Sequence, residues 1–269
     1  MLPPLREVIA RHGLSARKGL GQNFILDLNI TRKIARAAGD LSGVHVIEIG
    51  PGPGGLTRAL LETPAASVTT IELDERAIGV MNDLKETAGE RLTVHFGDAL
   101  EFDYATVPSP RAIIANLPYH VASQLLIGWL IQAQNFQSIT IMLQKEMAQR
   151  LVAKPRTPAY GRLSVMCQWL CDMKLVFDVP ASAFVPPPKV TSSIVHLVPK
   201  VEKPAVAFHQ MEKTVALAFS QRRKMLKGIL NANSLPGEEL MAKIGAIPTA
   251  RAEELTVEQF VQLALAISR

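Results

Sequence analysis

The chain has 269 residues and a net charge of +5, and 48% of its residues are hydrophobic, which fits one large or two modest globular domains with a buried core. The N-terminus lacks the continuous apolar stretch of a signal peptide, and no apolar run is long enough to span a bilayer, so we expect a cytoplasmic protein. The two cysteines, Cys167 and Cys171, lie four positions apart without a second Cys/His cluster, which indicates neighbours on a buried helix face rather than a disulfide or a zinc site.

Short extended segments alternate with helical ones through the first two-thirds of the chain. The segments rich in Val, Ile and Thr are 44–50, 67–74, 92–98, 111–116 and 138–144. The helix candidates between them are 55–62, 75–87 and 121–133. This alternation predicts an α/β fold with a parallel sheet covered on both faces. Two further strands, expected at 174–180 and 192–200, are close in sequence and can form an antiparallel edge.

After residue 200 only helical patterns remain. The candidates are 208–219, 222–231, 237–245 and 256–267. Thr256 and Gln259 have the spacing of a capping box at the start of the last one. We therefore predict an α/β domain over 1–203 and a small all-helical domain over 204–269.

A glycine-rich loop follows the first of the five strands in "VIEIGPGPGGLT". Glycines let the backbone turn sharply and come close to a ligand, and ligands of open α/β sheets bind at the carboxyl ends of the strands. Gly50, Glu72, Asp98 and Asn116 end four successive strands. Glu72 can accept both hydroxyls of a ribose, and Asp98 can accept from an adenine amino group. Ordinary loop chemistry explains any one of them, but four in succession favour a nucleotide site.

The loop leaves two kinds of nucleotide open. A dehydrogenase places a GxGxxG loop on the pyrophosphate of NAD. Here two prolines interrupt the glycines, and Glu48 lies two residues before Gly50, as in the E-x-G-x-G-x-G motif of S-adenosylmethionine-dependent methyltransferases, which the loop resembles. We favour S-adenosylmethionine, with NAD as the alternative.

The fourth strand ends in Asn116-Leu117-Pro118-Tyr119. This tetrapeptide is a common turn composition, but it also resembles the motif of methyltransferases that act on exocyclic amino groups of bases. The lone pair of an adenine amino nitrogen is delocalised into the ring. Acceptors at Asn116 and at a carbonyl near Leu117–Pro118 can localise it and aim it at a methyl group, while the Tyr119 ring stacks on a flipped-out base.

Two other features have a functional and a structural interpretation. Phe184, on the proline-rich loop "AFVPPPKV", is either a second stacking surface for the base or an anchor of that loop to the core. The basic cluster in "AFSQRRKMLKG" either neutralises phosphates of a nucleic acid or is a solvated face. Its members are Arg222, Arg223, Lys224 and Lys227.

Over nearly its whole length the chain resembles the ribosomal RNA adenine N6,N6-dimethyltransferases. The blocks that carry the resemblance occur in the family's order: "KGLGQNFILD", "EIGPGPGGLT", "IELD", "GDAL", "NLPY", "YGRLSVMCQ", "FVPPPKVTSSIV", "AFSQRRKMLKGIL" and "RAEELTVEQF". Among the members, the bacterial small-subunit type, which dimethylates two adjacent adenines in the 3′-terminal stem-loop, is the most similar. One departure is His120-Val121-Ala122, where many relatives have Asn-Ile-Ser.

The resemblance implies a Rossmann-like S-adenosylmethionine-dependent methyltransferase sheet followed by a small all-helical C-terminal domain that helps to engage RNA. It implies an immature small ribosomal subunit as the partner, and nothing in the sequence demands more than a monomer. The implied cofactor contacts are Asn23, Ile25, Gly50, Glu72, Asp98 and Asn116. The implied target-base positions are Asn116, Leu117, Pro118, Tyr119 and Phe184.

Three other functions stay open. A resistance-type methylase would share the fold and the tetrapeptide but act on the large subunit. An RNA-binding factor without catalysis would be expected to carry a damaged glycine loop or tetrapeptide, and both are intact here. A NAD-dependent oxidoreductase would bind NADH and not S-adenosylmethionine.

Overall fold

The computed structural model describes residues 2–17, 19, 21–119, 121–202 and 205–267. The chain forms two compact units, one from 1–148 with 174–199, the other from 149–173 with 200–269. The predicted boundary near residue 203 lies close to the third crossing between them, at 199/200. The sequence predicts 149–173 within the α/β domain, whereas this segment groups with the helical unit.

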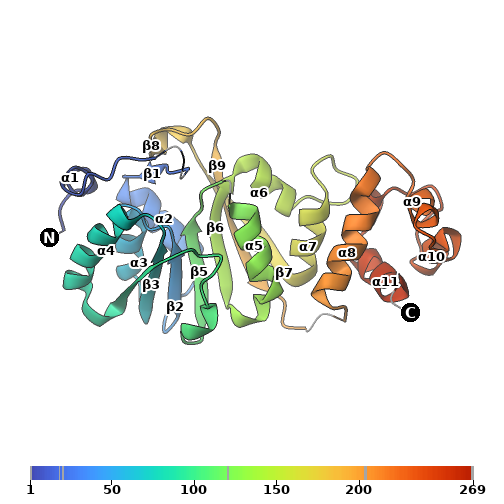
Figure 1. The fold of residues 1–269 in the computed structure, drawn as a ribbon, viewed down its shortest axis with the longest axis horizontal. Coiled ribbons are helices and arrows are strands. Elements are labelled where there is room, and N and C mark those ends of the chain that lie inside the picture. The colour runs from blue at the N-terminus through green and yellow to red at the C-terminus, as the bar shows by residue number, and fades with distance from the viewer. Residues whose placement is uncertain (1, 18, 20, 120, 203–204, 268–269) are drawn as a thin grey trace. The chain divides into compact units, whose positions relative to one another are not determined.

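A seven-stranded sheet forms the first unit, in the order β4-β3-β2-β5-β6-β9-β7 (Figure 1). Its strands are β2 (His45–Ile49), β3 (Ser67–Glu72), β4 (Leu92–Phe96), β5 (Arg111–Asn116), β6 (Ser138–Gln144), β7 (Cys171–Val179) and β9 (Ser192–Pro199). The first five pair in parallel, and β9 runs antiparallel to β6. The α/β prediction is therefore confirmed, including the antiparallel strand near the edge.

Helices cover this sheet and bury its central strands on both faces (Figure 1). Consecutive residues such as Val46 and Ile47 are both fully buried, although their side chains point to opposite faces. The helices of the unit are α1 (Leu5–Arg11), α2 (Leu28–Ala37), α3 (Gly55–Leu61), α4 (Glu75–Ala88), α5 (Ala122–Ile131) and α6 (Lys145–Leu151), whose last residues belong to the helical unit. Short 3-10 turns lie at Gly89–Arg91, Tyr104–Thr106, Ala133–Asn135 and Ala181–Ala183.

A second, two-stranded sheet joins two distant parts of the sequence. β1 (Phe24–Ile25) pairs antiparallel with β8 (Phe184–Val185), so that Phe24 faces Val185 and Ile25 faces Phe184. Phe24, Ile25 and Phe184 are all buried in the same hydrophobic cluster. The pairing brings the N-terminal segment, which here means residues 13–17 and 21–25, next to the proline-rich loop.

The second unit is helical. Its helices are α7 (Arg162–Leu170), α8 (Phe208–Ala218), α9 (Leu226–Ala232), α10 (Gly237–Lys243) and α11 (Val257–Ile267), with 3-10 turns at Phe219–Gln221 and Ala252–Glu254. Its core includes the stacked rings of Phe219 and Phe260, with centroids 5.7 Å apart. The predicted capping box is present: the Gln259 amide nitrogen donates to Thr256 Oγ1, and the Thr256 amide nitrogen donates to Gln259 Oε1.

Two local predictions for the helical unit were wrong. The helix expected at 222–231 begins only at Leu226, because Met225 is extended and the Leu226 amide nitrogen donates to the Ala250 carbonyl at 2.9 Å. The cysteines do not share a helix, since α7 ends at Leu170 and Cys171 starts β7. Both thiols are free and buried, and burial raises the pKa of each.

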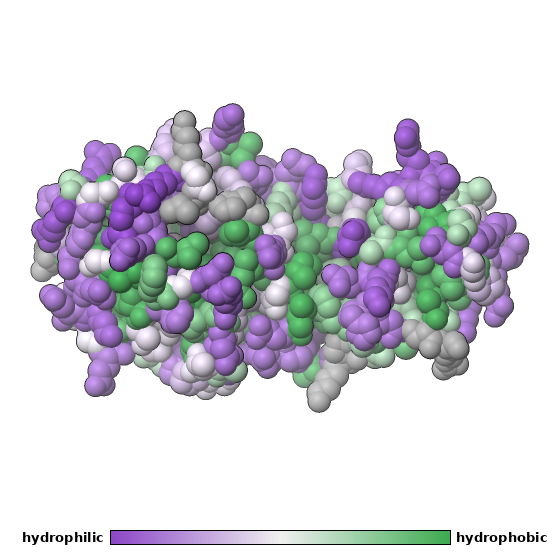
Figure 2. Space-filling view, in the orientation of Figure 1, coloured by the Kyte–Doolittle hydropathy of each residue, from purple (hydrophilic) through white to green (hydrophobic). Residues whose placement is uncertain are grey.

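Figure 2 shows hydrophilic side chains spread over the visible face of each unit, with hydrophobic residues between them. Among the described residues, no helix has both the length and the apolar character needed to cross a bilayer.

Candidate active site

A cavity opens where the carboxyl ends of β2, β3, β4 and β5 meet. Gly50, Glu72, Asp98 and Asn116 all line it, as expected for residues that follow parallel strands. The structure thus brings together the four strand-end residues that the sequence singles out. Their roles remain predictions at this point.

The glycine loop takes a path that side chains would obstruct. Gly50 and Gly52 have φ values of 65° and 52°, in the region that L-residues with side chains rarely adopt. A Cβ on Gly52 would also lie 3.0 Å from Cε1 of Phe24. The loop therefore passes close under the N-terminal segment and leaves room for a ligand beside its backbone.

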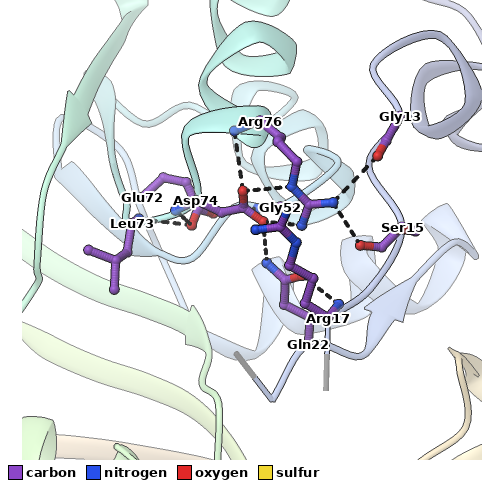
Figure 3. A network of polar contacts seen from close by, with 9 residues as sticks. All are labelled: Gly13, Ser15, Arg17, Gln22, Gly52, Glu72, Leu73, Asp74 and Arg76. Carbon is purple, nitrogen blue, oxygen red and sulfur yellow. Dashed lines mark hydrogen bonds and ion pairs between the residues drawn. The ribbon is translucent and has the colours of Figure 1, made fainter. Parts of the chain in front are cut away.

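Glu72 is held rigidly at the end of β3. One carboxylate oxygen accepts from the Leu73 and Asp74 amide nitrogens at 2.9 and 2.8 Å, and the other accepts from the Gly52 amide nitrogen at 3.1 Å (Figure 3). Burial raises the pKa of Glu72, and these backbone donors oppose the shift. The carboxylate oxygens still have lone pairs for hydroxyl donors of a ligand.

A second carboxyl group, Glu48, lies beneath the loop. It is 1% exposed, and its Oε2 has no hydrogen-bond partner among the described residues. Burial, with Glu72 as a smaller contributor, raises the pKa of Glu48 to about 8, against the opposing effect of the Thr57 hydroxyl. Glu48 is therefore protonated at neutral pH, which removes the cost of a buried charge.

The cavity wall at β4 is formed by Asp98, whose Oδ1 accepts from the Leu100 amide nitrogen at 2.9 Å. Leu73 and Leu100, both exposed, line the same cavity. A planar apolar ring with an exocyclic amine can lie between these leucines and donate to the carboxylate. The sequence reasoning found Asp98 but missed the leucines, because only their position next to Glu72 and Asp98 distinguishes them from other leucines.

Asn116 is oriented by the N-terminal segment. Its Nδ2 donates to the Asn23 carbonyl at 3.3 Å, whereas its Oδ1 accepts no hydrogen bond from the described residues. Because the amide nitrogen is engaged, the oxygen is the atom left for a ligand donor. Asn23 also lines the cavity, and its own side chain donates to the Gly21 carbonyl at 3.2 Å.

The rest of the tetrapeptide closes the cavity next to Asn116. Leu117 is 2% exposed, and the Pro118 carbonyl accepts from the Val121 amide nitrogen at 3.2 Å, which forms a turn. The Tyr119 hydroxyl is 2.7 Å from Ser192 Oγ at the start of β9, so the ring is held at both ends. His120, which departs from the pattern of relatives, lies outside the described residues.

Phe184 and Ile25 differ in their access to the cavity. Phe184 lines it but is only 2% exposed and belongs to the hydrophobic core, so both of its predicted roles are compatible with its position. Ile25 pairs with Phe184 and is not among the residues that line this cavity.

The charge of the cavity discriminates between the two candidate cofactors. Its lining contains the carboxylates Glu72, Asp74 and Asp98 and no lysine or arginine among the described residues. A dinucleotide pyrophosphate would be repelled by these carboxylates, and no described cation of the lining offsets them. S-adenosylmethionine has no phosphate and a positive sulfonium, so the residues present fit it.

The basic cluster lies entirely in the helical unit, in the turn before α9 and on its first residues. Arg223 and Lys224 are exposed, and no ion pair or side-chain hydrogen bond engages their charges among the described residues. Arg222 instead donates to the Pro158 and Tyr160 carbonyls and to Glu253 at 3.1–3.2 Å, and Lys227 is 3.6 Å from Glu238. The four residues that the sequence groups together are therefore not equivalent.

A parallel sheet with an antiparallel strand, a glycine loop after its first strand and a carboxylate after its second define the class of Rossmann-like methyltransferases. Comparison with known proteins agrees. A family model described as ribosomal RNA adenine dimethylase matches residues 13–269. This chain belongs to the ribosomal RNA adenine dimethylase family, whose members are S-adenosylmethionine-dependent methyltransferases.

Curated relatives match along almost the full length. Ribosomal RNA small subunit methyltransferase A of Paramagnetospirillum magneticum is 54% identical, over 99% of this chain and 95% of the relative. The protein of the same name from Sinorhizobium medicae is 53% identical, over 98% and 97%.

Solved structures agree with the fold. A dimethyladenosine transferase from Plasmodium falciparum has a TM-score of 0.79 and 29% identity, over 90% of this chain and 96% of that one. The 23S rRNA methyltransferase ErmE has a TM-score of 0.70 and 28% identity, over 92% and 100%.

Proposed function

We propose that this chain transfers methyl groups from S-adenosylmethionine to the N6 atoms of two adjacent adenines in the 3′-terminal stem-loop of small-subunit ribosomal RNA, giving N6,N6-dimethyladenosine. Its family membership and its full-length similarity to relatives named for the small subunit support the substrate. The observation that carries the chemistry is the Asn116 amide, which is anchored by Asn23 with its oxygen left to accept.

In this proposal the cofactor supplies an electrophilic methyl group. Glu72 accepts from the ribose hydroxyls, Asp98 accepts from the amino group of the cofactor's adenine, and the backbone at Gly50 runs beside the remainder. Asn23 and Ile25 contribute from the N-terminal segment. The absence of cations from the described lining of the cavity favours this cofactor over NAD.

The target adenine is activated by acceptors rather than by a strong base. Asn116 Oδ1 accepts one N6 hydrogen, and the Leu117 carbonyl is the better second acceptor because that of Pro118 already accepts from Val121. Two acceptors localise the nitrogen lone pair and aim it at the methyl group. Tyr119, fixed through Ser192, and Phe184 stack on the flipped-out base.

Two further proposals concern the partner and the location of the protein. We propose that the helical unit, which contains the predicted domain 204–269, helps to engage RNA through Arg223 and Lys224. Lys227 and Arg222 are weaker contributors, because an ion pair occupies the first and carbonyls and Glu253 occupy the second. The substrate is then an immature small ribosomal subunit, bound by a monomer in the cytoplasm.

Transfer of tritiated methyl groups to unmethylated small subunits, large subunits and free RNA tests this function. We expect label in the small subunit. Label confined to the large subunit would instead assign a resistance-type activity. Binding of S-adenosylmethionine without any transfer would make the protein an RNA-binding factor, and binding of NADH alone would make it an oxidoreductase.

A further inference from the structure

Hydrogen bonds from Arg76, which also forms an ion pair with Asp74 after β3, attach the N-terminal segment to this part of the unit. The proposed methyl transfer does not use them. Arg76 donates from Nε and Nη2 to the two carboxylate oxygens of Asp74, at 2.9 and 2.6 Å. Its Nη1 donates to the Ser15 carbonyl at 3.1 Å and to the Gly13 carbonyl at 3.4 Å. Figure 3 shows the guanidinium between the carboxylate and these carbonyls. The planar fork of arginine suits this double task, which a lysine could not perform.

Gln22 makes a second attachment to the same carboxylate. Its Nε2 donates to Asp74 Oδ2 at 2.9 Å, and its Oε1 accepts from the Arg17 amide nitrogen at 3.0 Å. The Asp74 side chain is only 3% exposed. The hydrogen bonds from Arg76, with those from Gln22, lower the pKa of Asp74 to about 2, so the carboxylate stays charged across the working pH range. Hydrogen bonds to a charged acceptor are stronger than neutral ones, so Asp74 holds Gln22 and Arg76 firmly in place.

The residue that Asp74 holds, Gln22, is the sequence neighbour of the residue that orients Asn116. Gln22 precedes Asn23, whose carbonyl accepts from Asn116 Nδ2 at 3.3 Å. Gln22, Asn23, Asp74 and Asn116 all line the candidate cofactor cavity. An amide that lost this acceptor could rotate and present nitrogen where oxygen is needed.

We propose that Gln22, Asp74 and Arg76 are positioning residues for methyl transfer: they hold the N-terminal segment so that the Asn23 carbonyl fixes the Asn116 amide with its oxygen toward the target amine. This inference rests on the proposed function. It predicts that attachment of the N-terminal segment and correct orientation of Asn116 are lost together, because the same hydrogen bonds secure both.

The test is the turnover of Arg76→Gln at saturating S-adenosylmethionine, with small subunits as substrate. If the segment only retains the cofactor, Arg76→Gln should raise the KM for S-adenosylmethionine, and saturation should restore kcat. The inference predicts that kcat stays roughly 10- to 100-fold below that of the unaltered protein, the size expected from a misplaced catalytic group. A kcat within twofold of the unaltered protein at saturation would overturn it.

Two companion variants keep the result interpretable. Arg32→Gln removes a bidentate pair with Glu62, at 2.6 and 2.8 Å, on the same unit but outside this cavity, and should leave kcat unchanged. Gln22→Met removes both hydrogen bonds of Gln22 without leaving a buried charge unpaired, and should lower kcat in the same direction as Arg76→Gln even if that variant unfolds. Normal turnover of Gln22→Met would also contradict the inference.

Hydrogen exchange provides a readout that does not depend on activity. The amides of residues 13–17 and 21–24 should exchange faster in Arg76→Gln, while β2 and β5 stay protected. His12 still bonds Asp83 at 2.8 Å, so α1 keeps an attachment to α4. If the unaltered protein methylates no RNA, the proposed function fails. If the unaltered protein methylates small-subunit RNA and the Arg76→Gln and Gln22→Met variants have the same kcat, only this inference fails.

Discussion

Asn116 combines two tasks in one side chain. Its nitrogen is fixed by the Asn23 carbonyl, and its oxygen is left to accept. An alanine at this position removes the acceptor but no charge, so the fold and the carboxylates that are proposed to hold the cofactor remain. Asn116→Ala should therefore bind S-adenosylmethionine within a few-fold of the unaltered affinity.

Methyl transfer by Asn116→Ala should fall by about 100-fold or more, since one preorganised hydrogen bond to the reacting group is typically worth that much. Single-turnover transfer to small subunits and calorimetric titration of the cofactor measure the two quantities. Asn135→Ala, an exposed asparagine of the same unit, is the matched control. Unchanged transfer by Asn116→Ala would remove this residue from the mechanism.

Glu48 gives the ligand-free protein a distinctive dependence on pH. Because its pKa is raised from 4.5 to about 8 in the folded protein, the native state holds a proton that the unfolded state loses, and stability falls as pH rises through that interval. Glu48→Gln has no such proton. It should therefore be more stable than the unaltered protein at pH 9, by on the order of 1–2 kcal/mol after relaxation of the site.

Urea unfolding of Glu48→Gln and the unaltered protein at pH 5, 7 and 9 measures this difference in the free energy of unfolding. The gap between the two proteins should widen steadily with pH. A gap that is constant over the range would mean that Glu48 is ionised in the folded state at pH 5 as it is at pH 9.

At the scale of the elements, the strands and their order along the chain could be predicted because β-branched runs alternate with helical segments at regular intervals. β1 and β8 could not. Two-residue strands have no periodicity, and their pairing joins residues 24–25 to 184–185 across most of the chain. The same limit explains why Gln22 and Arg76 were missed at the site: their importance arises from contacts between distant segments.

A substitution can separate the two interpretations of Phe184, which lies in β8. Phe184→Leu keeps most of the buried volume, so the free energy of unfolding should fall by only about 1–2 kcal/mol. If the ring stacks on the target base, as we propose, methyl transfer should fall by roughly 5- to 100-fold. Phe136→Leu, a buried phenylalanine of the same unit away from the cavity, is the control.

Thermal unfolding and steady-state transfer, measured on both leucine variants, decide between the interpretations. Equal losses of stability with a loss of activity confined to Phe184→Leu would support stacking. Activity that follows stability alike in both variants would leave Phe184 as an anchor of its loop.

At the scale of the whole molecule, the surroundings of each basic residue decide whether its positive charge is available to RNA. Arg223 and Lys224 are exposed and extend from a turn, whereas Arg222 is occupied by two carbonyls and Glu253. Replacing Arg223 and Lys224 together by glutamine should weaken RNA binding without a cost in stability. If each neutralises one phosphate, the salt dependence of log K should flatten by about 1.4–1.8.

Binding of small subunits or their RNA over a range of salt concentrations measures that slope. The control replaces Lys213 and Lys243, exposed lysines of the same unit, by glutamine, and so removes the same net charge. An equal slope for the Arg223/Lys224 variant and the unaltered protein would mean that this cluster does not contact RNA.

In the proposed function, the cavity at the strand ends directs two methyl groups to N6 of adjacent adenines, with Asn116 as the orienting acceptor. Mass-spectrometric mapping of methylated nucleotides in small-subunit RNA, after incubation with S-adenosylmethionine and either the unaltered protein or Asn116→Ala, tests it most directly. We predict N6,N6-dimethyladenosine at two neighbouring positions near the 3′ end with the unaltered protein and almost none with the variant. Methylation of another base or atom, or equal modification by Asn116→Ala, would contradict the account.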